Sequence, residues 1–119
     1  MILADTSVLS TLARVEALEL LWELFPNSPL GVTPAVFHEV SEAIEQGCTW
    51  LVQAPELIKN GRLQLAVPTS AQILGAESLP DSLGLGEREA IALCQAHGWA
   101  FLTNDRRARN YWFFAGAAA

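Results

Sequence analysis

Residues 2–9 read Ile-Leu-Ala-Asp-Thr-Ser-Val-Leu, and this stretch carries the pattern that decides the fold. Its first three residues form a short apolar run, which is typical of a buried strand. Asp5, Thr6 and Ser7 follow at once, and side chains of these types cap the free N–H groups at the start of a helix. The apolar residues after them recur at helical spacing. The stretch therefore predicts a buried strand that leads directly into a helix.

The same arrangement recurs at residues 30–34, where an apolar run precedes Thr33 and Pro34, and at residues 100–105. Proline is favoured in the first turn of a helix, with threonine before it as the cap. Further segments are a strand over 63–67, a loop over 80–84, and helices over 16–25, 34–46, 69–79 and 86–97, with 48–60 partly helical. Short apolar strands that alternate with helices predict a three-layer α/β/α fold with a short parallel sheet.

Composition limits the class of protein. The chain has 119 residues, of which 51% are hydrophobic, and we expect one folded domain over residues 1–119. No apolar run reaches the roughly 18 residues that a membrane helix needs. The start lacks the basic region of a signal peptide, so we expect a cytoplasmic protein with no membrane partner. Cys48 and Cys94 have no metal-ligand spacing and are expected to be buried free thiols.

The net charge is −6, which argues against nucleic-acid binding by general electrostatic attraction. A site that holds divalent cations changes this expectation, because the bound metal cancels the negative charge of its carboxylate ligands. The position of the basic residues also matters. Four of the seven, Arg88, Arg106, Arg107 and Arg109, fall in the last third of the chain. A local basic surface on an acidic protein is therefore possible.

Several acids are placed where a parallel sheet gathers its ligands, outside the carboxyl ends of the strands. Asp5 follows the first predicted strand, and Asp105 follows the last. Glu39 lies one turn into the helix after Thr33, and Glu87 and Glu89 lie on the helix before the last strand. Carboxylates brought together raise one another's pKa unless a cation compensates them, and hard divalent cations prefer oxygen ligands.

Each acid also has an ordinary structural interpretation. Asp5 and Asp105 can be simple helix caps, which is the commonest role of aspartate at such a place. Glu39, Glu87 and Glu89 can be solvated helix residues, and the last two also suit the positive end of the helix dipole. Taken singly, each acid favours this interpretation. The combination favours a site, because an aspartate with neighbouring hydroxyl residues occurs at two strand ends.

Four segments, residues 2–9, 32–40, 86–93 and 102–107, resemble the four acidic motifs of the PIN-domain family, in the family's order. The resemblance implies a parallel sheet with helices on both faces and a metal-dependent ribonuclease site. Many relatives are toxins that pair with an antitoxin. The family's final strand and helix have no counterpart after Trp112, which implies a domain that is shortened at this end.

The resemblance also assigns roles to individual residues. Asp5 matches the first family acid, Glu39 the second and Asp105 the fourth. The third is Glu89 as first choice and Glu87 as second, and because they are two residues apart on a helix they cannot point the same way. Supporting polar positions are Thr6, Ser7, Thr103 and Asn104, the last standing where relatives often carry a second aspartate. Arginines that could hold flanking phosphates are Arg106, Arg107 and Arg109.

The expected function is a metal-dependent endoribonuclease that hydrolyses RNA phosphodiester bonds with Mg²⁺ or Mn²⁺, and the toxin of a toxin–antitoxin pair is one form of it. The alternative is a PIN-like module with weak or no activity that serves in binding or oligomerisation. An apolar segment over 111–114 predicts self-association as a homo-oligomer. Metal-dependent stabilisation and RNA cleavage distinguish the two interpretations.

Overall fold

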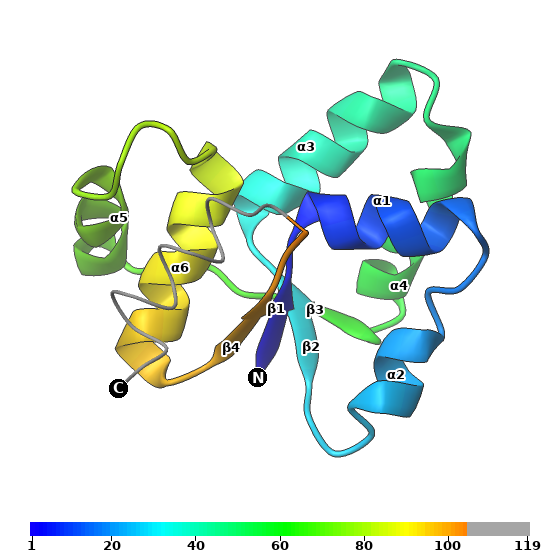
Figure 1. The fold of residues 1–119 in the computed structure, drawn as a ribbon, viewed down its shortest axis with the longest axis horizontal. Helices are drawn as coiled ribbons and strands as arrows, with labels where there is room; N and C mark the ends of the chain where they lie inside the picture. The colour runs from blue at the N-terminus through cyan, green and yellow to red at the C-terminus, as the bar shows by residue number, and fades with distance from the viewer. Residues whose placement is uncertain (105–119) are drawn as a thin grey trace.

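The structure is a computed structural model, and it describes residues 1–104 of the chain. Four parallel strands form one sheet in the order β3-β2-β1-β4 (Figure 1). The strands are β1 (Ile2–Ala4), β2 (Leu30–Val32), β3 (Leu63–Leu65) and β4 (Ala100–Leu102). The helices are α1 (Thr6–Arg14), α2 (Leu20–Leu24), α3 (Pro34–Glu45), the 3₁₀ helix η1 (Thr49–Val52), α4 (Gln53–Lys59), α5 (Ser70–Glu77) and α6 (Leu85–His97).

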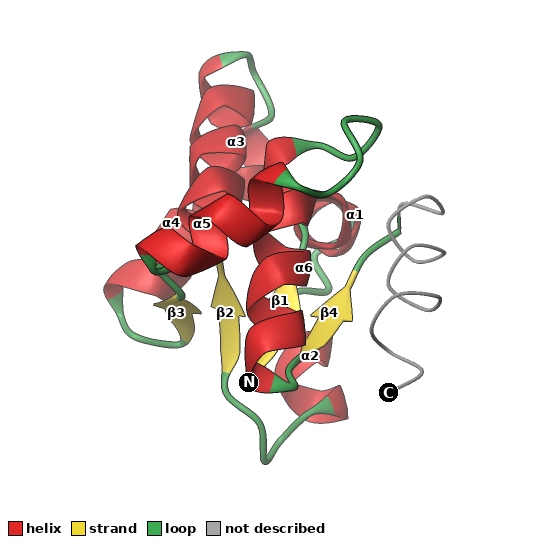
Figure 2. Ribbon diagram, turned by 90° about the vertical axis from the view of Figure 1, so that its left-hand side faces the viewer, coloured by secondary structure: helices red, strands yellow, loops and turns green. Residues whose placement is uncertain are grey.

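Helices cover both faces of the sheet, because successive strand residues point to opposite sides. Ile2 and Ala4 of β1 belong to a large buried cluster with side chains of α1 to α4. Leu3, between them, packs on the other face against Leu93 and Cys94 of α6. Figure 2 looks onto this second side, where α5 and α6 lie in front of the sheet. The prediction of a three-layer α/β fold with a short parallel sheet is confirmed.

A glycine in β2 allows the neighbouring strand β3 and the side chain of Met1 to approach closely. A Cβ atom on Gly31 would lie 2.9 Å from the backbone oxygen of Gln64 and 2.9 Å from Met1 Sδ. Both distances are shorter than van der Waals contact, and the Gln64 oxygen is fixed by the sheet. Only glycine therefore fits at the middle of β2.

Three predicted elements are shorter than the sequence pattern implied, and one of them, the helix expected over 69–79, spans Ser70–Glu77. The helix expected over 16–25 spans only Leu20–Leu24, because α1 ends in a tight turn before it. Glu16 adopts a left-handed conformation (φ 57°), and the N–H of Ala17 donates to the carbonyl of Leu12 at 2.8 Å. This is a Schellman-type ending. The strand expected over 63–67 ends at Leu65, on the edge of the sheet.

Further predictions concerned the two cysteines, membrane helices and the last part of the chain. Cys48 and Cys94 are both free thiols, but only Cys94 is buried as predicted, whereas Cys48 is half-buried. Burial raises the pKa of the Cys94 thiol to about 12. No helix within residues 1–104 is long and apolar enough to cross a membrane. The predictions that concern the last helix, Asp105, the three arginines at 106, 107 and 109, and the apolar segment over 111–114 lie outside the described residues.

Candidate active site

Asp5 lies at the point where the strand order of the sheet reverses. The chain passes from β1 to β2 and β3 on one side, and then returns to place β4 on the other side of β1. In open parallel sheets, ligands bind outside the carboxyl ends of the strands at this switch point. Asp5 directly follows β1, its N–H donates to the carbonyl of Leu102 at 3.0 Å, and it is only 5% exposed.

Both oxygens of the Asp5 carboxylate accept hydrogen bonds. The backbone N–H of Thr6 donates to Oδ1 at 2.7 Å, which is the helix cap that the ordinary interpretation predicted. The hydroxyls of Ser7 and Thr103 donate to Oδ2, at 3.1 Å and 2.7 Å. These three donors hold the carboxylate in one orientation. Capping explains Oδ1, whereas Oδ2 is held by a residue 98 positions away in the sequence.

Thr6 connects Asp5 to Glu39. Its hydroxyl donates to Glu39 Oε2 at 2.8 Å, while its backbone N–H donates to Asp5. Glu39 is positioned by the start of α3, where the hydroxyl of Thr33 accepts from the N–H of Val36 at 3.3 Å and Pro34 occupies the first turn. The structure therefore brings together the first and second predicted acids, which are 34 residues apart in the sequence.

Gly86 is a further site residue, whose steric role the sequence analysis missed. A Cβ atom at this position would lie 2.7 Å from Glu39 Oε1 and 3.1 Å from Val36 Cγ2. The absence of a side chain at Gly86 lets α6 pass directly beside the Glu39 carboxylate. One signal was available in the sequence, because glycine has a lower helix propensity than alanine and its place in the first turn of a helix needs a compensating reason.

The two candidate third acids have different partners. Glu89 Oε1 accepts from the N–H of Ala35 at 3.2 Å, in the first turn of α3. Glu87 Oε1 accepts from the N–H of Gly84 at 3.1 Å, at the start of its own helix. Ala35 lies one turn before Glu39 on α3. Glu89 is thus directed to the helix that carries the second acid, whereas this contact of Glu87 is local.

Asn104 ties the end of β4 to α1. Its backbone N–H donates to Ser7 Oγ at 3.2 Å, and its side-chain Nδ2 donates to Thr11 Oγ1 at 3.1 Å. Ser7 in turn donates to Asp5. Thr6, Ser7, Thr103 and Asn104 therefore all take part in one hydrogen-bonded network around Asp5 and Glu39. Asp105 is the next residue, outside the part of the chain that the structure describes.

The donor chemistry of this network fits a hard divalent cation. Its carboxylates and hydroxyls are oxygen ligands of the kind that Mg²⁺ and Mn²⁺ prefer. Within residues 1–104, no group of three or more histidine, cysteine, aspartate or glutamate side chains is arranged to hold a metal ion. In the described part of the chain, Asp5 and Glu39 both accept hydrogen bonds from Thr6, and Glu89 accepts one from the N–H of Ala35.

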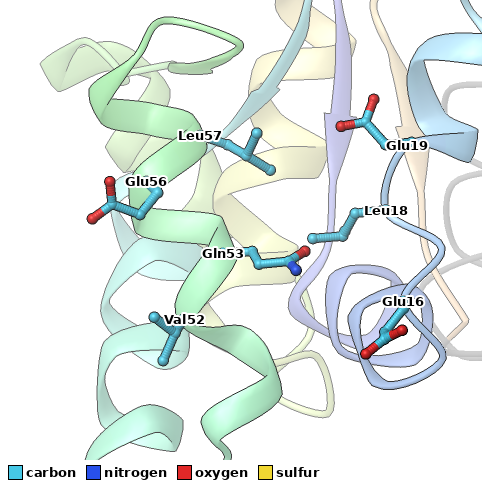
Figure 3. Close-up of a pocket in the computed structure, with 7 residues that line it drawn as sticks. All are labelled: Glu16, Leu18, Glu19, Val52, Gln53, Glu56 and Leu57. Carbon is cyan, nitrogen blue, oxygen red and sulfur yellow. The ribbon is translucent and has the colours of Figure 1, made fainter.

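A cavity of about 390 Å³ is lined by none of the residues of this network, and Figure 3 shows the side chains that line it. Glu16, Glu19 and Glu56 line it together with apolar side chains such as Leu18 and Leu57. No described lining residue is basic, and these glutamates are not arranged to hold a metal ion that would offset their charge against a phosphate. The Asp5 network, rather than this cavity, is therefore the candidate active site.

Glu19 also forms an exposed ion pair with a pH-dependent effect. Arg62 donates to both Glu19 oxygens, at 2.7 and 2.8 Å, and its guanidinium lies 4.4 Å from the centre of the Trp22 ring. The hydrogen bond from Arg62 lowers the Glu19 pKa below 4.5. Because the folded-state pKa is depressed, the pair stabilises the fold above the unfolded value and is lost as pH falls through the folded value.

We therefore expect Glu19→Gln to be less stable than the wild type at neutral pH, and the difference to shrink at pH values well below 4.5. Denaturant titration across that range measures it. A stability difference that stays constant with pH would show that the ion pair contributes nothing through ionisation of Glu19.

Comparison with known proteins identifies the family. A family model described as a PIN domain matches residues 1–112, which is most of the chain and includes all four predicted acid positions. A search of curated proteins finds no match. PIN domains are generally nucleases and typically use divalent metals, so the fold is of a nuclease type. The family match, the parallel sheet and the helices on both of its faces agree: the chain belongs to the PIN-domain family.

Proposed function

We propose that the chain is a metal-dependent endoribonuclease that hydrolyses RNA phosphodiester bonds at the Asp5 network. The observation that carries the proposal is the placement of Asp5. It is a buried carboxylate at the switch point of the sheet, connected through Thr6 to a second carboxylate, Glu39. Capping of α1 needs only one Asp5 oxygen, so the fixed orientation of the other supports a role beyond structure.

We assign Asp5, Glu39, Glu89 and Asp105 as the acids that hold Mg²⁺ or Mn²⁺. Glu89 is preferred to Glu87 because it reaches the first turn of α3. When bound, the metal lowers the pKa of a coordinated water and neutralises charge that develops on the phosphate. Thr103 and Ser7 fix the Asp5 carboxylate, and Thr6 fixes Glu39, so that neither acid has to be ordered during the reaction.

The substrate and partners belong to the same proposal. Arg106, Arg107 and Arg109 follow the last strand in sequence and are the candidates to hold phosphates on either side of the scissile bond. An antitoxin partner and a homo-oligomer are consistent with a toxin of this family. Because the net charge is −6, we expect metal rather than general attraction to make RNA binding favourable.

The first experiment measures metal dependence. Saturating Mn²⁺ should raise the melting temperature, and single-stranded RNA should be cleaved with Mn²⁺ or Mg²⁺ but not with excess EDTA. At a hundred times its Kd, a ligand stabilises the folded state by roughly 2.7 kcal/mol. For a small domain this corresponds to a shift on the order of 10 °C. A protein that shows neither stabilisation nor cleavage would instead be the inactive binding module.

A further inference from the structure

A groove of about 280 Å³ lies between α1, α2 and the end of β4. We propose that it binds the base of the RNA nucleotide next to the scissile phosphate. This inference rests on the proposed ribonuclease function and adds to it a subsite that recognises a nucleobase. In both ribbon views α1 lies at the carboxyl ends of the strands and α2 nearer their beginnings (Figures 1 and 2), so the groove leads away from the acidic network along the sheet.

The groove is continuous with the candidate active site. Thr103 lines it and also donates to Asp5 Oδ2 at 2.7 Å. Asn104, another lining residue, donates from its backbone N–H to Ser7 Oγ, and Ser7 donates to the same Asp5 oxygen. A nucleotide with its phosphate at the Asp5 network would therefore have this groove beside it.

The lining of the groove suits a nucleobase. Six of the nine described lining residues are apolar, among them Phe25, whose ring is partly buried against the core, and Leu24, which is 67% exposed. Bases stack on aromatic side chains and pack against flat apolar walls. A pocket for a drug-sized ligand usually measures about 300–1,000 Å³, so this groove is of a size for a smaller group.

Polar atoms at one end of the groove could read the edge of a base. Thr11 offers its hydroxyl, which accepts from Asn104 Nδ2 at 3.1 Å and keeps its own proton to donate. Asn104 Oδ1 accepts no hydrogen bond from residues 1–104. Hydrogen bonds link Thr11 to Asn104, Asn104 to Ser7, and Ser7 to Asp5, so a base joined to a phosphate bound at Asp5 would present polar atoms toward these groups.

Charge separates this groove from the larger cavity. None of its described lining residues is acidic, whereas three glutamates line the 390 Å³ cavity. The negative charge of the glutamates disfavours a ligand that carries phosphates in the cavity, whereas the described lining of the groove has no acidic side chain to repel it. An apolar polypeptide segment is the competing occupant, and it would need neither Thr11 nor proximity to the Asp5 network.

The test compares Phe25→Leu, which keeps apolar bulk but loses the aromatic face, with Phe37→Leu, a partly buried aromatic residue on α3 outside the groove. Stacking of a base on an aromatic side chain corresponds to roughly a 5- to 150-fold effect. We expect Phe25→Leu to raise KM for short single-stranded RNA by such a factor with little change in kcat, and Phe37→Leu to leave both unchanged. For the wild type, removing the base next to the cleavage site from the RNA should raise KM by the same factor. For Phe25→Leu, removing that base should raise KM no further, because the stacking contact is already lost.

A second measurement does not depend on cleavage or on the folding of the Phe25 variant. Each of the four nucleoside monophosphates is titrated into the wild-type protein without metal, and the NMR amide resonances of Thr11 and Asn104 are followed. Leu24→Ala should weaken the response, and Leu74→Ala, an equally exposed leucine (66%) on α5, should not. Shifts without any RNA cleavage would show that the groove binds a nucleotide but would overturn the ribonuclease proposal, and with it the placement of the base beside a scissile phosphate. The base site alone would be overturned if RNA were cleaved but the amide resonances did not shift, and if base removal and Phe25→Leu each raised KM independently of the other.

Discussion

Asp5→Asn should strongly reduce RNA cleavage and abolish the rise in melting temperature on Mn²⁺ addition, while the protein remains folded. Asparagine is as good a helix cap as aspartate, and its oxygen can still accept from the N–H of Thr6. The hydroxyls of Ser7 and Thr103 can turn to accept from the new amide group, because a hydroxyl both donates and accepts. What is lost is the negative charge. We expect a decrease of about 10²–10⁴ in kcat, which corresponds to several kcal/mol of transition-state stabilisation.

The matched control is Asp81→Asn, the same chemical change at a fully exposed side chain whose nearest ion-pair partner, Arg88, is 3.7 Å away. It should leave cleavage and the Mn²⁺ response unchanged. Single-turnover cleavage of a labelled RNA and thermal melts with and without Mn²⁺ measure both variants. If Asp5→Asn retained wild-type cleavage, the role of Asp5 would be limited to capping α1.

Local chemistry made much of the fold predictable. Thr33 and Pro34 identify the start of α3 because each residue has a conformational preference that suits that position. Gly98 likewise identifies the end of α6, where φ is +71°. The end of α1 was not predicted, because Glu16 occupies the left-handed position where glycine is usual. Without a glycine, the apolar spacing alone favoured a longer helix after it.

The candidate site was predictable in its acids and less so in its contacts. The strand end placed Asp5, and the family motif indicated Glu39. The side-chain direction of Glu89 and Glu87 depends on how α6 packs on α3, which neither sequence pattern determines. The closeness of Gly86 to the Glu39 carboxylate is likewise a tertiary contact. A glycine within a motif can indicate that another group approaches the backbone closely, but only the packing of the helices shows which group this is.

Gly86→Ala should lower RNA cleavage strongly while changing the free energy of unfolding only slightly. The added Cβ would lie 2.7 Å from Glu39 Oε1, at the flexible end of a side chain, so Glu39 can move and the fold can adjust. Val36 Cγ2, at 3.1 Å, has to give by a few tenths of an ångström. Alanine recovers up to about 1 kcal/mol of helix propensity, which offsets part of this overlap. We therefore expect the free energy of unfolding to change by no more than about 1–2 kcal/mol.

Cleavage should fall more steeply, by roughly 10- to 100-fold, because Glu39 would be displaced from Thr6 and a shift of about 1 Å at a catalytic group can cost that much. Gly75→Ala on α5 is the control: its Cβ would meet nothing within 4 Å, so stability should rise slightly and cleavage should not change. Adding Glu39→Asp to Gly86→Ala shortens the displaced side chain and should restore part of the cleavage. Wild-type cleavage by Gly86→Ala would mean that the position of the Glu39 carboxylate does not matter for the reaction, and would remove Glu39 from the metal-binding set.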